Sequence, residues 1–414
     1  MDQGAFVFSG ALCYNGASDI LLKEYFPKGM DHMTIRLYDQ DSMLLDFTAT
    51  VTGCFEKKGQ YVITLDQTAF FPEGGGQGAD HGTLGGVNVV DCHEHGGEVE
   101  HTTDRPLEVG AVVEGHVDAV RRLDMMQQHS GEHIFSGLVC QLFGYDNVGF
   151  HIGSEAVTMD FNGPLTEEDV RRVERLANEI VWQNVPVNTL LPSKEELEAM
   201  HYRSKKALEG TVRIVNIPGA DTCACCGTHV KQTGSVGQIK VMGWQKYKSG
   251  VRVSILCGRR ALEEESLLLE QGKNASVALS CKQQELCGAV ERVMAERDQL
   301  KFKNEQLGLR IFEMMAAQEE ENAVRMVVCD VLEPGAVRKA AGKLAVGAKL
   351  ALVLVPREEG YSFAMSSETE DVRPMTKALC QQFGGKGGGP KDMTQGVLMG
   401  GTEEEIRRML EQAV

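Results

Sequence analysis

The sequence predicts an α+β protein whose successive parts differ in their hydrophobic periodicity. Short β-rich runs separated by glycines come first, and helices mixed with strands follow. A long run with an apolar residue at every seventh position comes next, and strands alternate with helices after it. With 414 residues, 42% of them hydrophobic, the chain is too long for one ordinary domain and has enough apolar surface for several cores.

A β-barrel-like domain is expected at residues 33–117, after an N-terminal extension (residues 1–32) to which we assign no purpose. The β-rich runs are "MTIRLYD", "LLDFTATVTGC", "QYVITLD", "VNVVDC" and "AVVEGHVD", and glycine-containing turns separate them. This spacing is typical of a small, mostly antiparallel barrel or sandwich. The three histidines of "DCHEHGGEVEH" (His93, His95 and His101) are expected at its surface.

Residues 118–258 are expected to form an α+β domain. Leu123, Ile134 and Leu138 recur at helical spacing in "DAVRRLDMMQQHSGEHIFSGLVCQLFG". A second helix is expected at "TEEDVRRVERLANEIVWQN", with Thr166 as its N-cap and acidic residues in its first turn. The runs "VRIVNI", "GQIKVMGW" and "GVRVSILC" are the expected strands.

A heptad-patterned helical segment is expected at residues 259–320. Its apolar positions recur every seven residues: Leu279, Leu286, Val293, Leu300, Leu307 and Met314. Such a seam pairs with another helix and predicts a coiled coil. The partner is either a second copy of the chain, which would make a homodimer through residues 279–314, or the helix at "RRALEEESLLLEQ" folding back. The sequence leaves both open.

The last part, residues 321–414, is expected to be a small α/β domain. Strands at "VRMVVCDV", "AKLALVLVP" and "YSFAMSS" alternate with helices at "PGAVRKAAGKLA" and "VRPMTKALCQQF". A glycine-rich stretch, "GGKGGGPKDMTQGVLMGG", precedes a final helix. Its length of about 90 residues is well inside the usual range for a domain.

Charge and cysteine usage limit the function classes. The formal charge of -17 argues against unspecific attraction to nucleic acid, yet residues 201–260 hold eleven lysines and arginines against two acidic residues. The 12 cysteines are mostly scattered, which fits a reducing cytoplasm. No apolar run reaches the roughly 20 residues of a membrane span, so no membrane partner is expected.

Two separated motifs could hold one metal ion. In "QQHSGEHIFSGL", His129 and His133 stand four residues apart on the predicted helix, and "DTCACCGTHV" adds Cys225 and His229. Three imidazoles and one thiolate make the tetrahedral ligand set that Zn²⁺ prefers. The rival interpretation is an H-x-x-E-H metalloprotease with Glu132 as general base. It is not excluded, but it leaves the cysteine motif unexplained.

Four motifs together resemble the long form of the alanyl-tRNA editing proteins, free-standing relatives of the editing domain of alanyl-tRNA synthetase. They are "FFPEGGGQGADHGTL", "QQHSGEH", "CCGTHVKQTGSVGQIK" and "GGKGGGPKDMTQG", in that order. The resemblance implies a cytoplasmic, zinc-dependent trans-editing hydrolase that deacylates Ser-tRNA(Ala) or Gly-tRNA(Ala) and so protects translation fidelity. A tRNA-binding protein whose zinc is only structural is a further alternative.

The resemblance also implies roles for individual residues. His129, His133, Cys225 and His229 would bind one zinc ion per chain. Glu132 and His151 are the candidate catalytic residues. Glu132 occupies a position that varies in the family, which argues against a protease-like role, and His151 stands where the synthetase editing domain has glutamine.

Contact with tRNA is expected in three places. The glycine loops expose backbone N–H groups that can cradle phosphate, and the basic stretch flanks the zinc ligands. Neither loop has the spacing of a nucleotide-binding motif, so the chemistry is expected to be ATP-independent. By resemblance, the domain from residue 321 would grip the tRNA body. The expected tRNA-binding residues are Gly74, Gly75, Gly76, Gln77, Lys205, Lys206, Lys231, Gly385, Lys386, Gly387, Gly388 and Lys391.

Overall fold

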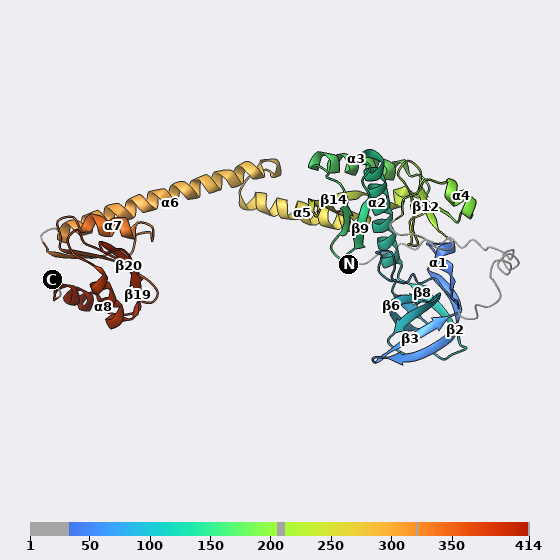
Figure 1. Cartoon of the computed structure of the whole chain (residues 1–414), viewed down its shortest axis with the longest axis horizontal. Coiled ribbons are helices and arrows are strands. Elements are labelled where there is room, and N and C mark those ends of the chain that lie inside the picture. Colours follow the sequence, from blue (N-terminus) through green and yellow to red (C-terminus); the bar gives the residue numbers. More distant parts are fainter. Residues whose placement is uncertain (1–32, 205–211, 320–321, 413–414) are drawn as a thin grey trace. The chain divides into compact units, whose positions relative to one another are not determined.

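The computed structural model describes residues 33–204, 212–319 and 322–412. The extension at residues 1–32 and the basic residues Lys205 and Lys206 therefore lie outside the described residues. The chain is divided into two compact units, Met1–Leu269 and Glu270–Val414 (Figure 1). Helices and several sheets occur together, so the predicted α+β class is confirmed.

Six strands of the first unit close a barrel. Inward and outward residues alternate along them: in β8, Val113 and Val117 are buried while Val112 and Glu114 are exposed. The strand expected at "MTIRLYD" is wrong in extent, because only β1 (Ile35–Arg36) is extended and α1 (Leu37–Gln40) follows it. The barrel order is β2 (Asp46–Lys57), β3 (Gln60–Leu65), β7 (Glu98–Thr103), β6 (Val87–His95), β5 (Gly82–Leu84) and β8 (Val112–Val117).

A hairpin between β6 and β7 changes the expected place of one histidine. Gly96 and Gly97 both have positive φ, 63° and 90°, and so allow a tight turn after His95. The strand β7 that follows carries His101 into the barrel, where it is fully buried. Its Nδ1 donates to the carbonyl oxygen of Ile63 (3.0 Å), and Thr68 lies 2.8 Å from its Nε2.

The helix α2 (Ala119–Phe143) is the centre of the rest of the first unit. Asp118 caps its start by accepting from two backbone N–H groups, and Gly144 ends it in the left-handed region. Two glycines let it approach its neighbours closely. A Cβ on Gly131 would lie 2.2 Å from the sulfur of Cys257, and one on Gly137 would lie 2.2 Å from the carbonyl oxygen of Ala220.

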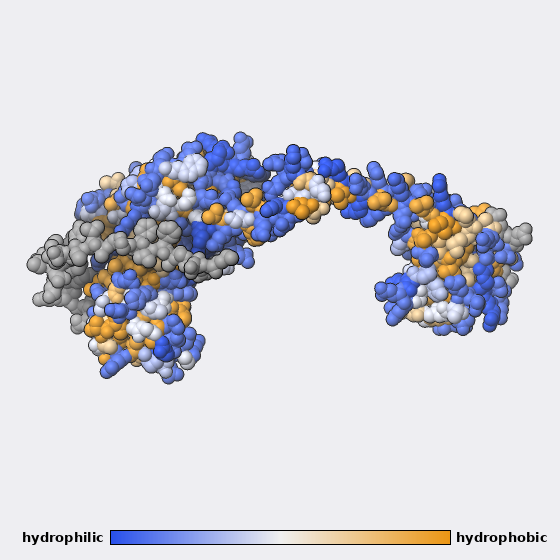
Figure 2. Space-filling model, turned by 180° about the vertical axis from the view of Figure 1, so that it is seen from behind, coloured by the Kyte–Doolittle hydropathy of each residue, from blue (hydrophilic) through white to orange (hydrophobic). Residues whose placement is uncertain are grey.

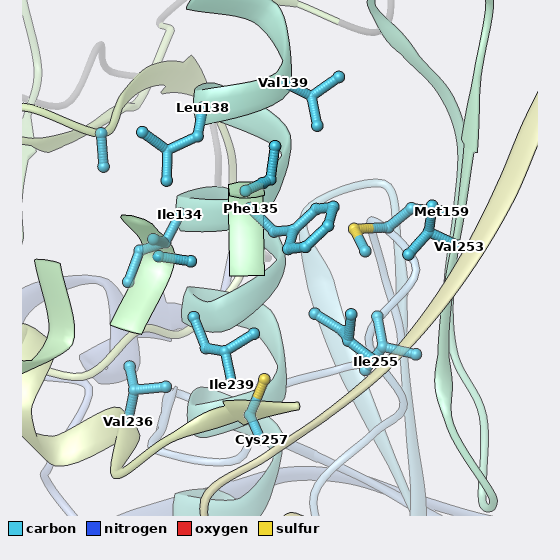
Figure 3. Packing of buried hydrophobic residues seen from close by; sticks show 14 of the residues in the cluster. Ile134, Phe135, Leu138, Val139, Met159, Val236, Ile239, Val253, Ile255 and Cys257 are labelled. Atoms are coloured by element: carbon cyan, nitrogen blue, oxygen red, sulfur yellow. The ribbon is translucent and has the colours of Figure 1, made fainter. Parts of the chain in front are cut away.

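Two small antiparallel sheets pack around α2. Figure 3 shows Phe135 of the helix among Met159, Val253 and Ile255 of the sheet strands. One sheet has the order β14 (Ile239–Tyr247), β15 (Gly250–Cys257), β10 (Val157–Phe161) and β9 (Asn147–Ile152). The other has the order β11 (Asn188–Leu190), β12 (Ile214–Ile217) and β13 (Asp221–Ala224). The first unit also contains β4 (Gln67–Thr68), which pairs with β1, α3 (Glu167–Gln183), with the predicted Thr166 cap, α4 (Lys194–Ala199) and the short 3-10 turn Thr233–Val236.

The second unit holds a five-stranded sheet between two apolar clusters. One cluster includes residues of α6 and α7 and the other includes residues of α8 and α9, so helices cover both faces. The sheet order is β16 (Val324–Val328), β17 (Leu350–Pro356), β18 (Tyr361–Ser366), β20 (Met393–Leu398) and β19 (Gly385–Gly388). The helices are α6 (Leu286–Ala316), α7 (Val337–Leu344), α8 (Arg373–Phe383) and α9 (Glu403–Glu411). Nowhere in the described chain is a helix apolar enough over sufficient length to cross a membrane.

The heptad seam lies on α6, but it starts later than the sequence suggests. The preceding helix α5 (Gly258–Ala278) stops just before Leu279, which therefore belongs to the connection. Seam residues on α6 are exposed within the single chain: Leu300 is 64% exposed, Leu307 56% and Met314 74%. Apolar patches accordingly interrupt the hydrophilic surface of this helix in Figure 2.

Candidate metal centre

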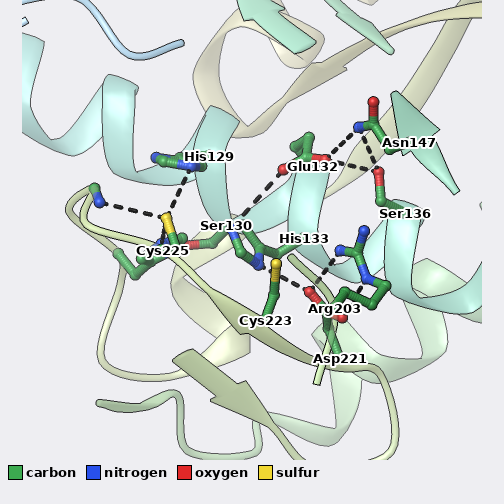
Figure 4. Close-up of polar contacts among 12 residues, drawn as sticks. His129, Ser130, Glu132, His133, Ser136, Asn147, Arg203, Asp221, Cys223 and Cys225 are labelled. Atoms are coloured by element: carbon green, nitrogen blue, oxygen red, sulfur yellow. Dashed lines mark hydrogen bonds and ion pairs between the residues drawn. The ribbon is translucent and has the colours of Figure 1, made fainter. Parts of the chain in front are cut away.

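Four side chains from two distant segments converge in the first unit. His129 and His133 lie one turn apart on α2, and Cys225 and His229 lie in the loop after β13 (Figure 4). One potential ligand atom from each residue lies within 4.8 Å of all the others. The sulfur of Cys225 is 3.4 Å from Nε2 of His129 and 3.4 Å from Nε2 of His229. The four residues form a group that could hold a metal ion.

The loop reaches α2 because it contains a glycine at the point of contact. A Cβ on Gly227 would lie 2.2 Å from the imidazole of His129, a distance that real side chains do not adopt. Gly131 and Gly137, on the helix itself, let neighbouring backbone and sulfur atoms approach α2 equally closely. Glycine inside a helix costs about 1 kcal/mol relative to alanine. At Gly131 and Gly137 this cost accompanies the close approach of Cys257 and Ala220 to the helix.

Each imidazole is held by a partner at its other nitrogen. Nδ1 of His129 lies 2.8 Å from Oε1 of Gln77, and Nδ1 of His229 lies 3.2 Å from Oγ of Ser130. Nδ1 of His133 lies 2.8 Å from Oδ2 of Asp221. Partners of this kind fix the ring orientation and tautomer and leave Nε2 available as a metal ligand.

Asp221 is itself anchored by an arginine. Arg203 donates to both carboxylate oxygens of Asp221, from Nε and Nη2, at 2.8 Å each. Burial raises the pKa of Asp221, but hydrogen bonds from Arg203 and His133 outweigh burial and hold that pKa below its usual value. The carboxylate is therefore charged and rigid where it meets His133 (Figure 4).

The centre is buried, and its residues shift one another's pKa values. His129, His133 and His229 are 1%, 2% and 3% exposed. Burial opposes ionisation of Cys225, but the charges of His129 and His133 outweigh it and hold the pKa of this thiol well below its usual value. Burial lowers the pKa of His133, but Cys225 and Asp221 more than offset this and raise it to about 10. A thiolate stabilised by neighbouring imidazoles is a strong metal ligand.

Glu132 lies beside the centre, fully buried. Oγ of Ser136 donates to its Oε1 at 2.7 Å, and Nδ2 of Asn147 donates to the same oxygen at 2.6 Å. Its Oε2 is 3.9 Å from Nε2 of His133. In an H-x-x-E-H protease the two histidines are joined by a carboxylate ligand, which here would come from a helix such as α3. Among the described residues, the group around His129 and His133 is completed by Cys225 and His229.

His151 is not brought to the four residues. It lies on β9 with an exposed side chain, whereas the ring of its neighbour Phe150 stacks on His129 with centroids 5.2 Å apart. Because successive side chains of a strand point to opposite faces, His151 is directed away from His129. Its catalytic role stays a prediction.

The first glycine loop forms a tight turn against the centre. Gly75 and Gly76 have positive φ, 61° and 86°, and Gly74 and Gln77 exchange both backbone hydrogen bonds at 3.0 Å. Gln77 is 1% exposed, and its amide also donates to Oγ1 of Thr228 at 2.8 Å. The side chain therefore contacts both His129 and Thr228, and its contact with tRNA stays a prediction.

The remaining expected tRNA residues lie at the surface in both units. In the first unit Lys231 is exposed and forms an ion pair with Asp41. In the second unit Gly385–Gly388 form the strand β19, and Lys386 and Lys391 are exposed. A cavity of about 460 Å³ adjoins β19 and contains two further cationic residues that the sequence analysis did not single out, Arg373 and Lys377.

The sequence analysis also missed the residues around the ligands. Asp221 lies four positions before Cys225 in "DTCACC", and a carboxylate so near a ligand motif is a usable signal for a histidine partner. Arg203 and Ser130 carry no such signal, because only the fold brings them to Asp221 and His229.

Comparison with known proteins places this fold and site in a class. The family model described as "Threonyl and Alanyl tRNA synthetase second additional domain" matches residues 212–254, which include Cys225 and His229. The chain is 30% identical to "Alanine--tRNA ligase" of Ignicoccus hospitalis over 86% of this chain, but it spans only 40% of that protein's length. The first unit thus contains a domain of the kind found in threonyl- and alanyl-tRNA synthetases.

Two free-standing relatives match nearly end to end. The chain is 27% identical to "Alanyl-tRNA editing protein AlaX-L" of Pyrococcus horikoshii, covering 90% of this chain and 96% of that protein. It is also 27% identical to "Alanyl-tRNA editing protein Aarsd1" of Rattus norvegicus, covering 87% of this chain and 93% of that protein. The chain is a homologue of the long-type alanyl-tRNA editing proteins, as its motifs predict.

Proposed function

We propose that the chain is a zinc-dependent trans-editing hydrolase that deacylates Ser-tRNA(Ala) or Gly-tRNA(Ala) in the cytoplasm. The observation that carries the proposal is the convergence of His129, His133, Cys225 and His229. Three imidazole nitrogens and one sulfur suit Zn²⁺, whereas hard cations prefer oxygen donors. All three rings are held at Nδ1, as zinc-binding histidines are. One ion per chain fits this donor set.

The chemistry asked of the site is modest. An aminoacyl ester is already labile, so catalysis needs a positioned water and a stabilised oxyanion more than the breaking of a difficult bond. A zinc ion bound here supplies Lewis-acid polarisation. Gln77, Asp221 and Ser130 keep the imidazoles in place, and the Gly74–Gln77 turn brings the barrel against the same centre.

A need for editing follows from the size of the amino acids involved. A site built for alanine cannot exclude the smaller glycine well, and it rejects serine poorly because serine adds only a hydroxyl. A separate hydrolytic site corrects both errors. Both free-standing relatives are named alanyl-tRNA editing proteins, which supports this assignment.

We further assign the parts of the chain to tasks. Residues 33–117 would be the barrel with the glycine loop, 118–258 the zinc-containing editing domain, 259–320 the coiled-coil segment and 321–414 a tRNA-gripping domain. In the last part, Lys386, Lys391 and the neighbouring Arg373 and Lys377 would contact phosphates. In the first part, the described candidates for the acceptor end are Gly74, Gly75, Gly76, Gln77 and Lys231.

The test is hydrolysis of Ser-tRNA(Ala), Gly-tRNA(Ala) and Ala-tRNA(Ala) by the full chain, with and without a chelator. We expect the serine or glycine ester to be cleaved, the alanine ester to be spared, and Cys225→Ser or chelation to abolish cleavage. Tight tRNA binding by metal-loaded protein without any deacylation would instead make the metal structural. Cleavage of a peptide would favour the metalloprotease.

Glu132→Gln separates the editor from the protease. Because Glu132 is fully buried and already accepts hydrogen bonds from Ser136 and Asn147, we expect the amide variant to keep most of the deacylation. A protease would lose its general base and its activity with it. His151→Ala, measured beside it, tests whether the exposed histidine contributes at all.

A further inference from the structure

A cavity of about 290 Å³ adjoins the ligand loop and carries charged groups that metal binding does not use. It reaches this loop at Cys226, the neighbour of Cys225. The turn at Gly74 and Gly75 forms another part of its wall. The charged residues around it are Arg36, Asp39, Glu73, Glu94 and Arg213.

Arg213 connects this cavity to the metal centre. Its Nη1 donates to the carbonyl oxygens of Cys225 and Gly227, at 2.8 Å and 2.9 Å, so it supports the ligand loop directly. The side chain is only 9% exposed, and its Nε finds no hydrogen-bond partner among the described residues. The nearest carboxylate oxygen is Oδ1 of Asp39 at 3.8 Å, which is too far for a hydrogen bond.

Asp39 lies on the other side of this gap. Its carboxylate is about two-thirds buried and pairs with Arg213 only at long range. Burial raises the pKa of Asp39, and the charges of Arg213 and Arg36 offset this only in part. Such a carboxylate is stabilised by a cation that reaches it and donates hydrogen bonds.

The charges that line the cavity of about 290 Å³ also favour a cationic ligand. Two cations, Arg36 and Arg213, line the cavity together with three carboxylates, and Arg36 forms an ion pair with one of them, Glu94. The wall thus holds one more negative than positive charge. Asp39 also borders a second, smaller cavity of about 170 Å³ that includes His229. A small cationic group entering from either side would meet the same carboxylate.

We propose that Asp39 binds the α-ammonium group of the amino acid that is esterified to the tRNA. The inference rests on the proposed function and names the feature of the substrate that this site would recognise. In an aminoacyl ester a single carbon separates the ammonium group from the carbonyl that is attacked, so its binding group must adjoin the hydrolytic centre. The consequence is selectivity: aminoacyl-tRNA is hydrolysed, whereas peptidyl-tRNA and other N-blocked esters are spared.

The test compares Ser-tRNA(Ala) with N-acetyl-Ser-tRNA(Ala) for the full-length wild type, Asp39→Asn and a control, Asp46→Asn. Asp46 is an exposed acid of the barrel, and its removal changes the net charge equally. For the wild type and the control we expect kcat/KM to fall roughly 10- to 100-fold on acetylation. Asp39→Asn should lose activity on the free amine by a similar factor and show no further loss on acetylation. Asp39→Ser serves as a second variant, and thermal unfolding shows whether each variant is folded.

Binding provides a readout that does not depend on hydrolysis. Calorimetry measures the affinity for 3′-(L-seryl)amino-3′-deoxyadenosine and for its N-acetyl derivative. The wild type should bind the free amine more tightly than the acetylated form, and Asp39→Asn should bind both equally. Equal hydrolysis and binding of free and blocked forms by the wild type would overturn the inference while leaving the editing function intact. Amine-dependent binding through Asp39 without any deacylation would preserve the inference and refute the function. Absence of both would refute both.

Discussion

At the scale of single residues, we expect the loss of Asp221 to weaken metal affinity more than the loss of any other residue that holds a ligand. Asp221→Asn removes the charge that holds His133 through Nδ1 and that Arg203 supports. Loss of such a partner weakens metal affinity roughly 10- to 100-fold. Competition with a chromophoric chelator measures this affinity directly.

The matched control for that experiment is Asp46→Asn. Asp46 also accepts a hydrogen bond from a histidine, His116, at 2.7 Å, but this pair lies exposed on the barrel and belongs to none of the candidate metal-binding groups of the described chain. We expect it to leave metal affinity unchanged. Equal affinities for all three proteins would show that Asp221 does not position His133 for an ion.

A second prediction at this scale concerns pH and the buried His101. Burial lowers the pKa of His101 from an ordinary value of 6.5 to about 4. Between pH 4 and pH 6.5 the unfolded chain therefore binds more protons than the folded chain. The contribution of His101 to the free energy of unfolding is complete above pH 6.5 and is lost as the pH falls towards 4. The whole effect is on the order of 3 kcal/mol. His101→Asn keeps a donor for the carbonyl oxygen of Ile63. Chemical denaturation at pH 7.5 and pH 5 should show a smaller difference in the free energy of unfolding for this variant than for the wild type. An equal difference for both proteins would contradict the prediction.

Residue identities that define the centre could be read from the sequence, whereas their surroundings could not. His129 and His133 follow from helical spacing, and Cys225 and His229 from a short local pattern. The contact of Gln77 with His129 was not predicted, because the docking of the barrel on α2 is a long-range contact without a local signal. The expected surface position of His101 was wrong for a related reason. Gly96 and Gly97 form the turn of a hairpin, and the alternation of side chains along the following strand places His101 inside the barrel.

At the scale of elements, α6 has an apolar seam that the described part of the second unit does not cover. Leu300→Glu would place a charge in this seam, and if two copies pair there the dimer should dissociate. Light scattering after size exclusion should then show a dimer for the wild type and a monomer for the variant. Gln306→Glu adds the same charge outside the seam and should leave the mass unchanged. A monomeric wild type at micromolar concentration would refute the pairing.

The elements themselves were predictable to different degrees. Apolar residues at helical spacing indicate α2, and a clear 3.6-residue periodicity together with the Thr166 cap indicates α3. The run "MTIRLYD" alternates like a strand, yet it turns into α1 because Tyr38 is buried there and packs edge-on against Phe71, at 5.4 Å between ring centroids. Tertiary packing overrides a short local pattern in such cases.

At the scale of the whole molecule, two distant pieces of chain must be folded around α2 before any metal site exists. His129 and Cys225 are 96 positions apart, and the barrel adds Gln77 from a third place in the sequence. Metal binding and folding of the first unit should therefore be coupled, as they are in other sites assembled from separate segments. The described α/β part of the second unit has its own sheet and two apolar clusters, and it does not depend on this centre.

The most direct measurement is zinc K-edge X-ray absorption on the purified full chain after loading with one equivalent of zinc. The account predicts three nitrogen neighbours at about 2.0 Å and one sulfur at about 2.3 Å, with the sulfur lost in Cys225→Ser. A spectrum with oxygen and nitrogen neighbours only, unchanged by Cys225→Ser, would contradict it.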